Sequence, residues 1–463
     1  MFRFNRLALS AATLGVPTPR LNDINDVFRT AQKVWNVDFK GGPAATQTLN
    51  FIYNRSPAVP VFHIMDLNGG TSLENGLTNP PDSDHDPSFH FTPQDEESLI
   101  PRPVAERILR TMLIQNAMDK VLLEAQRQGR ISFYISMFGE EAAVTGAVAG
   151  LSDRDELFLQ YREASALHYR GYTIKDVISK CVGNIECKEK GRSMPMFYGS
   201  RSINTQMISG PLATKIPHGS GSGYAFRLEN EELLKDLPPG TDLAEVPEAR
   251  ISATFMGEGA TSEGDFHAAL NFASTLGSHA LFFVRNNGYA ISTTTQEQYC
   301  GDGILSRAAG YGMPAARVDG NDVLAVYNTV RMARNIILRY NIPVLVESFT
   351  YRVGHHSTSD DSTAYREKDE IDFFIRNIDP IKRFEQFMIR RGWWDASQSK
   401  SLMNEARKDV LNELRRQEKL PTWPIETLLD DVFEDLTPHI QKEKKMLVEH
   451  YQRHKAQYDT EKH

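Results

Sequence analysis

Residues 256–265 read Met-Gly-Glu-Gly-Ala-Thr-Ser-Glu-Gly-Asp, and residues 285–289 read Arg-Asn-Asn-Gly-Tyr. Each of these segments directly follows an apolar run of strand length. In a doubly wound parallel sheet both turns fall at the carboxyl ends of strands, where such folds bind their ligands. The spacing therefore predicts an α/β fold that brings together Glu258 and Asn287, which are 29 positions apart in the chain.

Glu258 and Asn287 offer hard oxygen atoms, which suit a magnesium ion held by few protein ligands and by substrate phosphates. A helix after Ser262 would direct free backbone N–H groups at a bound diphosphate. Gly257 and Gly259 let the backbone come close. An ordinary glycine-rich turn is the alternative, because Asn-Asn-Gly is a common turn sequence. The acid, the glycines and the later Asn pair together resemble the thiamine-diphosphate signature.

The composition narrows the class of protein. A chain of 463 residues could hold two or three domains, or one large α/β domain with extensions. The net charge of −8 and the pI near 5.9 argue against nucleic acid as a main partner. No stretch approaches the ~20 apolar residues of a membrane span. Cys181, Cys187 and Cys300 form no C-x-x-C pair and no disulfide framework, which indicates structural thiols in a reducing compartment.

Four regions differ in character. Residues 1–20 carry arginines and hydroxyl residues but no acid, as in a mitochondrial presequence, although a disordered N-terminus could look similar. Residues 21–100 are rich in proline beyond residue 40 and predict an extended arm that lies on another surface, such as a partner subunit. Residues 101–380 alternate strands and helices, which predicts a doubly wound, mostly parallel sheet. Residues 381–463 predict a charged, helical C-terminal region.

Periodicity places the individual elements. Helices are expected at 103–129, 265–276 and 322–340, and strands at 131–136, 250–256, 280–284, 316–318 and 343–351. The acidic, proline-containing segment at 229–249 reads as an inserted surface loop. Trp393-Trp394 is expected to anchor the C-terminal region by packing. The charged stretch after Thr437 is either a solvated helix or a docking surface.

Two further segments carry candidate binding groups. Tyr161 and Arg162 precede a helical pattern, where a guanidinium can bind phosphate oxygens in fork geometry. A surface ion pair is the alternative for this arginine. Residues 209–215 form a tight turn that enters a helix and could offer main-chain groups to a ligand ring, or could be simply a loop.

A polar loop at 351–361 reads Tyr-Arg-Val-Gly-His-His-Ser-Thr-Ser-Asp-Asp and follows an apolar strand to the same edge of the sheet. His356 could exchange a proton near neutral pH. Adjacent histidines can also bind zinc, but neighbours in an extended loop diverge and no cysteine is close. The clustered hydroxyls and acids indicate mobility and a phosphorylation site, because phosphate would add about two negative charges beside the phosphate-binding groups.

Five segments occur in an order that resembles the alpha subunits of mitochondrial branched-chain 2-oxo acid dehydrogenases, in their decarboxylase component. The resemblance runs from about residue 50 into the C-terminal region, and the segments are 160–164, 211–214, 257–260, 285–292 and 354–361. The run His-His-Ser-Thr-Ser-Asp-Asp favours this family over the pyruvate dehydrogenase alpha subunits, whose loop usually reads His-Gly-His-Ser-x-Ser-Asp-Pro.

The resemblance implies a role for each matching residue. Magnesium would be held by Glu258, Asn287 and the main-chain carbonyl of Tyr289. The residues that would contact thiamine diphosphate are Tyr161, Arg162, Gly210, Leu212, Gly257, Glu258, Gly259, Ala260, Arg285, Asn287 and His356. His356 would also be the catalytic proton donor when the acyl group passes to a lipoyl arm. The loop would be ordered by Arg352, Asp360, Tyr365 and Arg366, and Ser357 would be its inhibitory phosphorylation site.

The resemblance also implies partners and a reaction. The chain would join a beta subunit in an α2β2 heterotetramer in the mitochondrial matrix, with a lipoyl-bearing acyltransferase core and a regulatory kinase and phosphatase as further partners. It would decarboxylate the branched-chain 2-oxo acids of Val, Leu and Ile catabolism and acylate the lipoyl group reductively. Pyruvate as the substrate is one alternative, and a non-catalytic assembly or regulatory paralogue is another. Intact Glu258, Asn287 and His356 argue against the latter.

Two positions depart from the family pattern in ways that bear on function. Lys215 stands where the family usually has Gln, in a candidate potassium loop with Ser209, Pro211 and Thr214, and an ammonium there could replace the ion or repel it. Glu367 stands where the family often carries a second phosphorylated serine, so that site is expected to be absent.

Overall fold

The computed structural model describes residues 58–73, 89, 91 and 98–458. The expected presequence at 1–20 and most of the expected arm at 21–100 lie outside these residues. A large unit comprises Val59–Leu233 and the chain from Leu243 onward, and Leu234–Asp242 belongs to a separate small unit.

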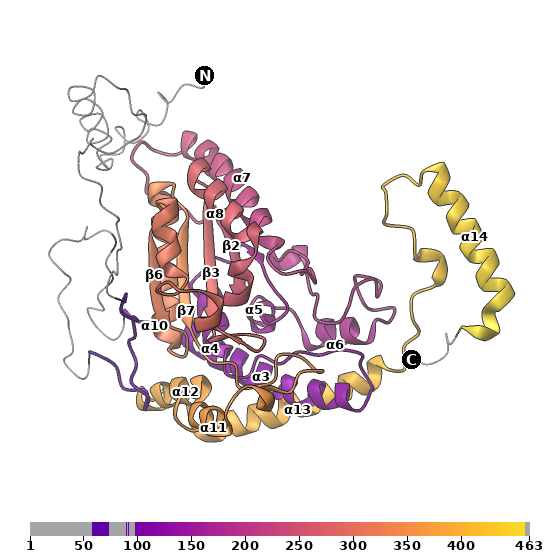
Figure 1. Ribbon diagram of the computed structural model, residues 1–463, viewed down its shortest axis with the longest axis horizontal. Coiled ribbons are helices and arrows are strands. Elements are labelled where there is room, and N and C mark those ends of the chain that lie inside the picture. The colour runs from indigo at the N-terminus through magenta and orange to yellow at the C-terminus, as the bar shows by residue number, and fades with distance from the viewer. Residues whose placement is uncertain (1–57, 74–88, 90, 92–97, 459–463) are drawn as a thin grey trace. The chain divides into compact units, whose positions relative to one another are not determined.

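A parallel sheet of five strands lies at the centre of the large unit, in the order β1-β2-β3-β7-β6 (Figure 1). The strands are β1 Glu156–Phe158, β2 Ser252–Gly257, β3 Ala280–Asn286, β6 Ala315–Asp319 and β7 Val344–Phe349. All seven residues of β3 are buried, as in a parallel strand with helices on both faces. A short antiparallel hairpin, β4 Tyr289–Ala290 and β5 Thr293–Thr294, follows β3. The expected α/β class is confirmed.

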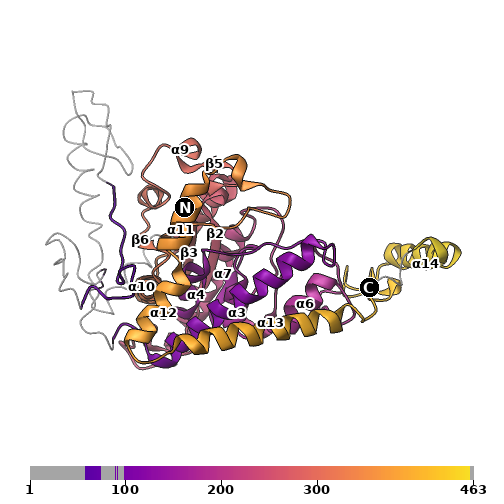
Figure 2. The same cartoon turned by 90° about the horizontal axis from the view of Figure 1, so that it is seen from below.

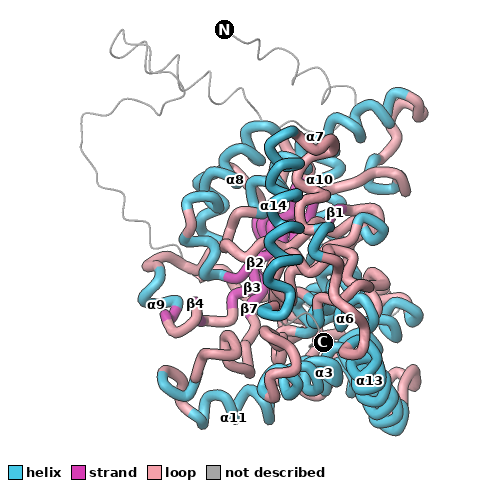
Figure 3. The backbone as a smooth tube through the Cα atoms, turned by 90° about the vertical axis from the view of Figure 1, so that its right-hand side faces the viewer, coloured by secondary structure: helices cyan, strands magenta, loops and turns pink. Residues whose placement is uncertain are grey.

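Helices pack on both faces of this sheet, and in Figure 3 the strands lie at the centre with helices around them. On one face, α7 Lys215–Lys235 and α8 Gly264–Leu276 share a buried apolar cluster with residues of β2, β3 and β7. On the other face, α10 Val323–Tyr340 contacts β3, β6 and β7 and also α4 Glu141–Ala149. Gly219 allows α7 to approach β2, because an added Cβ would lie 1.9 Å from the Thr254 hydroxyl.

The remaining helices lie before, between and after the strands. They are α3 Arg102–Arg127, α5 Ala164–Tyr169, α6 Ile174–Val182, α9 Thr295–Gln298, α11 Lys368–Asn377, α12 Pro380–Arg390, α13 Ala396–Gln417 and α14 Pro438–His454. α13 runs beside α3 (Figure 2). Trp394 is buried, and its indole N–H donates to the Ser399 hydroxyl at 2.8 Å, as expected of a packing anchor. No helix in the described part of the chain is long and apolar enough to cross a membrane.

A described stretch of the expected arm, residues 62–65, lies on this chain's own sheet. Phe62 forms a parallel bridge with Val318 of β6. The backbone N–H groups of Ile64 and Met65 both donate to the Asp322 carboxylate at 2.6 Å. These bonds fix residues 62–65 beside the start of α10.

Two expectations were wrong. Residues 131–136 are not a strand of the sheet. Polar side chains bind the backbone at the end of this segment instead: Arg162 donates to the Ser136 carbonyl, and the Met137 N–H donates to Asp119. The segment at 229–249 is not simply a loop, since α7 continues through Lys235. Its residues 229–235, Glu-Asn-Glu-Glu-Leu-Leu-Lys, are mostly good helix formers.

Candidate functional site

The parallel register brings the two opening turns together. Gly257 at the end of β2 pairs with Arg285 near the end of β3, so the residues that follow lie beside each other at the carboxyl edge of the sheet. The backbone N–H of Asn287 donates to Glu258 Oε2 at 3.4 Å, and both residues are buried. The structure thus brings Glu258 and Asn287 together, as the spacing predicts.

The Glu258 carboxylate is suited to binding a cation. It is 1% exposed, and its Oε1 atom makes no hydrogen bond within the described residues. Burial, together with repulsion from Glu140, raises the pKa of Glu258 to about 7. A buried carboxylate oxygen without a partner is unfavourable unless a cation or a donor binds it. One carboxylate, one amide oxygen and one main-chain carbonyl form a set that magnesium accepts.

The alternative of a zinc site at the adjacent histidines concerns His355 and His356. Across the described residues, no group of three or more His, Cys, Asp or Glu side chains is placed to hold a metal ion. His355 bonds instead to Ser362, whose hydroxyl and backbone N–H both lie 3.0 Å from Nδ1. The adjacent histidines therefore have separate environments.

The turn after β2 differs slightly from the expectation. Residues Glu258–Ser262 form a 3-10 helix, and α8 begins at Gly264. Gly259 packs tightly, because an added Cβ would lie 3.0 Å from the Ala290 Cβ. At Gly257 the nearest atoms would be 4.0 Å away, so packing does not require that glycine. Ala260 is buried in the apolar cluster beneath the turn.

Arg285 is held by two buried carboxylates. Its Nη1 donates to Glu140 Oε1 at 2.7 Å, and its Nε donates to Glu163 Oε1 at 2.8 Å. Burial lowers the pKa of Arg285, but Glu163 and Glu140 outweigh this effect and raise it above the ordinary value, so the guanidinium is permanently charged. It lies on β3, next to the Asn pair.

Arg162 connects the same cluster to the polar loop. It is buried, and its Nη2 donates to the carbonyl of His356 at 2.6 Å. Its Nε lies 3.6 Å from Glu140 Oε2. Tyr161, beside it, places its ring edge-on to the His356 ring, with the centroids 6.3 Å apart. The structure therefore joins the 160–164 segment to both the sheet edge and the loop, and the surface ion-pair alternative for Arg162 is wrong.

His356 is held as a neutral imidazole. Burial, with the positive charges of Arg162 and Arg352, lowers its pKa to about 3. Its Nδ1 lies 3.1 Å from Nη1 of Arg352. A guanidinium can only donate, so Nδ1 must accept, and the ring proton is on Nε2. His356 thus presents an N–H donor at Nε2.

The other loop residues bind one another. The Asp360 carboxylate accepts from the His356 backbone N–H and from the Tyr365 hydroxyl, both at 2.7 Å. Arg366 donates to the carbonyls of Arg352 and Gly354. The Ser357 hydroxyl lies 3.3 Å from that of Ser359. The four residues expected to order the loop are therefore all engaged in it.

The 209–215 turn adjoins the Glu258 turn through apolar packing, because Ala213 belongs to the same buried cluster as Ala260. Thr214 closes the turn: its hydroxyl lies 2.8 Å from that of Ser209 and 3.3 Å from the Pro211 carbonyl. Lys215 begins α7, and partial burial lowers its pKa. Gly210 packs under the Phe197 ring, and Leu212 is 40% exposed.

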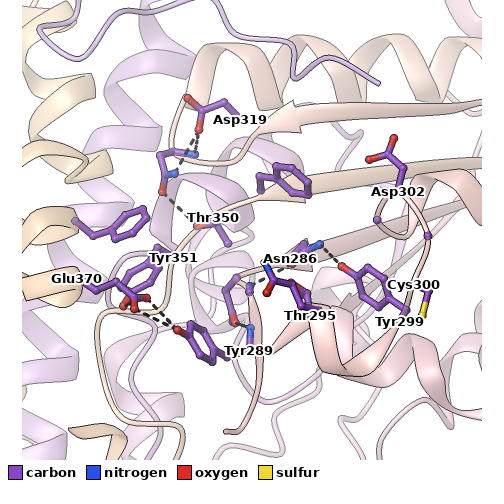
Figure 4. Close-up of a pocket in the computed structure, with 18 residues that line it drawn as sticks. Asn286, Tyr289, Thr295, Tyr299, Cys300, Asp302, Asp319, Thr350, Tyr351 and Glu370 are labelled. Carbon is purple, nitrogen blue, oxygen red and sulfur yellow. Dashed lines mark hydrogen bonds between the residues drawn. The ribbon is translucent and has the colours of Figure 1, made fainter. Parts of the chain in front are cut away.

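A cavity of about 850 Å³ opens on the other side of the Asn pair (Figure 4). Of the residues assigned above to the cofactor or the metal, Asn287 and Tyr289 line it. The Tyr289 hydroxyl donates to Glu370 across one side, at 3.2 Å from each carboxylate oxygen. Because Glu258, Arg162 and His356 do not line it, this cavity does not coincide with the cluster described above.

Sequence reasoning missed two members of the cluster, Glu140 and Glu163. Glu163 was quoted within the 160–164 segment without a role. Glu140 lies in the Gly-Glu-Glu at 139–141, directly after the segment 131–136 that reads as a strand. That pattern predicts no role for Glu140. The available signal was an acid pair directly before an alanine-rich helix. That signal is weak, because the sequence does not distinguish a buried acid pair from an exposed one.

Comparison with known proteins agrees with this geometry. The family described as Dehydrogenase E1 component matches residues 109–426. A mitochondrial 2-oxoisovalerate dehydrogenase subunit alpha from Dictyostelium discoideum is 42% identical over 86% of this chain and 82% of its own length. The protein of that name from Pan troglodytes is 39% identical over 99% of this chain and 96% of its own. The subunit alpha 1 from Arabidopsis thaliana is 39% identical over 86% and 77%. The chain therefore belongs to the dehydrogenase E1 component family.

Proposed function

We propose that this chain is the alpha subunit of a mitochondrial, thiamine-diphosphate-dependent dehydrogenase of branched-chain 2-oxo acids. The observation that carries the proposal is the meeting of Glu258 and Asn287 at the sheet edge, together with the bond from Arg162 to the backbone carbonyl of His356. The relatives named 2-oxoisovalerate dehydrogenase subunit alpha support the choice of substrate. They also support a mitochondrial location.

When bound, thiamine diphosphate supplies the electron sink that decarboxylation of a 2-oxo acid requires. Glu258, Asn287 and the Tyr289 carbonyl would hold its magnesium ion. Arg162 and Arg285 are buried, and their guanidinium groups would supply positive charge to the diphosphate. His356 would donate a hydrogen bond from its Nε2–H to the oxygen of the acyl group, because its Nδ1 is occupied by Arg352.

The chain would act with partners. A beta subunit would complete the active site in an α2β2 heterotetramer, and a lipoyl-bearing acyltransferase would receive the acyl group. A kinase and a phosphatase would act on Ser357, which is half-buried in the loop that carries His356. Phosphate on Ser357 would bring about two negative charges next to Asp360 and would loosen the loop by repulsion. Phosphopeptide mass spectrometry of the native complex tests this assignment, which an unmodified Ser357 under every nutritional state would contradict.

The decisive experiment compares substrates. The chain is co-expressed with its cognate beta subunit, and release of carbon dioxide is measured with 3-methyl-2-oxobutanoate and with pyruvate, in the presence of thiamine diphosphate and Mg2+. We expect faster turnover of the branched acid and loss of turnover in His356→Ala and Glu258→Ala. Preference for pyruvate would replace branched-chain 2-oxo acids by pyruvate as the proposed substrate. No turnover by an assembled, cofactor-loaded tetramer would favour a non-catalytic paralogue.

A further inference from the structure

Glu140 lies at the centre of the site, although no role was assigned to it above. It directly precedes α4 and its side chain is fully buried. Its Oε1 accepts from Arg285 Nη1 at 2.7 Å and from Asn287 Nδ2 at 3.2 Å. Its Oε2 is 3.6 Å from Arg162 Nε and makes no hydrogen bond within the described residues. One carboxylate therefore contacts both arginines and one proposed magnesium ligand.

These contacts fix the orientation of the Asn287 amide. A carboxylate only accepts hydrogen bonds, so the end of the amide that faces Glu140 must be its NH2 group. At the other end, the backbone N–H of Tyr289 donates to Asn287 Oδ1 at 3.2 Å. A backbone N–H only donates, so this contact gives the same orientation independently. The amide oxygen, which is the atom able to bind a metal ion, is thereby kept away from Glu140 and on the side of the Tyr289 turn.

The backbone around Glu140 packs closely against the residues that follow β7. Gly139 has a φ of +90°, and an added Cβ would lie 2.2 Å from the Tyr351 carbonyl oxygen. The Thr350 hydroxyl donates to the Gly139 carbonyl at 3.1 Å. These contacts leave residue 140 little freedom to move relative to the sheet edge. Burial opposes ionisation of Glu140, but Arg285 and Arg162 outweigh it and hold the pKa of this carboxyl below its ordinary value.

We propose that Glu140 is a positioning residue for the metal and diphosphate sites, one that turns the Asn287 oxygen toward the metal position and fixes the spacing of Arg285 and Arg162. This inference rests on the proposed function. A purely structural role is the competing account, in which Glu140 only neutralises two buried arginines. The two accounts differ in what replacement does to magnesium affinity, because only the positioning role links Glu140 to a metal ligand.

The test replaces Glu140 by Gln in the assembled α2β2 protein. Glutamine keeps the size of the side chain, but it cannot form the ion pairs, and either end of its amide can face Asn287. The matched control is Glu141→Gln, because Glu141 is also buried but accepts instead from Gly139 N–H at 2.8 Å and Asn116 at 3.0 Å. Mg2+ affinity is measured by calorimetry at saturating thiamine diphosphate, and thermal stability is measured without either.

We expect Mg2+ to bind ~10- to 100-fold more weakly in Glu140→Gln, as for other residues that orient metal ligands, and within ~2-fold of wild type in Glu141→Gln. Unchanged Mg2+ affinity in Glu140→Gln would overturn the inference, even if the thermal stability fell. Wild-type protein that binds no Mg2+ with the cofactor would overturn the proposed function itself. If Glu140→Gln does not assemble, Glu140→Asp is used, which keeps the charge but is one methylene short, and wild-type Mg2+ affinity there would overturn the inference.

Discussion

Glu140 and Glu141 are neighbours in the chain, both with buried side chains, yet their carboxyl groups are held in opposite ionisation states. Burial acts on both. Glu140 contacts two guanidinium groups, which keep its pKa below the ordinary value. Among the described residues no cation pairs with Glu141, and burial raises its pKa to about 8 despite hydrogen bonds from Asn116 and the backbone. At neutral pH the Glu140 carboxyl is therefore ionised and the Glu141 carboxyl is protonated.

Glu141 should make the protein less stable as the pH rises toward 8. Its pKa is higher in the folded protein than the ordinary 4.5, so unfolding releases a proton between these values. The stabilisation is complete below the unfolded pKa, falls by roughly 1.4 kcal/mol per pH unit within the window, and is lost above the folded pKa. Glu141→Gln should lose less stability between pH 5.5 and 7.5 than wild type does. Denaturation at both pH values checks this, and parallel losses in the two proteins would contradict it.

His356 should remain uncharged between pH 5 and 8, because burial and two guanidinium groups lower its pKa to about 3. With histidine labelled by carbon-13, the His356 resonance, assigned by its loss in His356→Gln, should keep a constant chemical shift over that range. Adding the diphosphate cofactor should raise the pKa, since negative charge favours the imidazolium ion. A titration midpoint between pH 5 and 8 in the protein without cofactor would disprove this prediction.

Lys215 should make the 209–215 turn independent of potassium. Its ammonium group, partly buried at the start of α7, stands in the candidate potassium loop. The melting temperature of wild type should be equal in sodium and potassium buffers. Lys215→Gln should gain potassium stabilisation, about 2.7 kcal/mol at a concentration ~100 times the dissociation constant. Strong stabilisation of wild type by potassium would show that the loop still binds the ion.

Asp360→Asn should loosen the loop at 351–366. The substitution removes a charged acceptor from the His356 N–H and from the Tyr365 hydroxyl, and such bonds contribute about 1.5–3 kcal/mol before solvent exposure is discounted. Proteolytic cleavage within the loop should accelerate roughly tenfold, which corresponds to 1.4 kcal/mol. Asp361→Asn is the matched control, because the Asp361 carboxylate accepts only from Thr363 in this loop. Equal cleavage of both variants would show that the Asp360 contacts do not order the loop.

Much of the fold could be predicted from periodicity. The helices at 265–276 and 322–340 and the strands at 280–284 and 316–318 lie within or very near the observed elements. These segments are long or continuously apolar, and turn residues bound them clearly. The register that brings Glu258 to Asn287 followed from the rule that parallel strands present their carboxyl ends at one edge.

Residues 131–136 show a limit of prediction from local sequence patterns. Tyr134, Ile135 and Ser136 are buried in succession, so the alternation in sequence does not mark one buried face. The backbone at the end of this segment bonds to Asp119 and Arg162 rather than to a neighbouring strand. Such partners are distant in sequence, and periodicity contains no information about them. The proposed role of Glu140 could not be predicted from the sequence for the same reason. It depends on Arg285 and Arg162, which are distant in sequence and are brought near Glu140 by the fold.

The packing of α13 on α3 connects the C-terminal region to the segment that carries Glu140. Arg130, just beyond α3, forms a two-pronged ion pair with Glu418, just beyond α13, at 2.7 and 2.8 Å. α3 also carries Asp119, which holds the backbone at Met137, three residues before Glu140. A premature stop ahead of α13 would leave every proposed cofactor- and metal-binding residue in the chain, but it would expose the face of α3 that α13 covers. Such a truncated product should fail as a protein rather than as a catalyst.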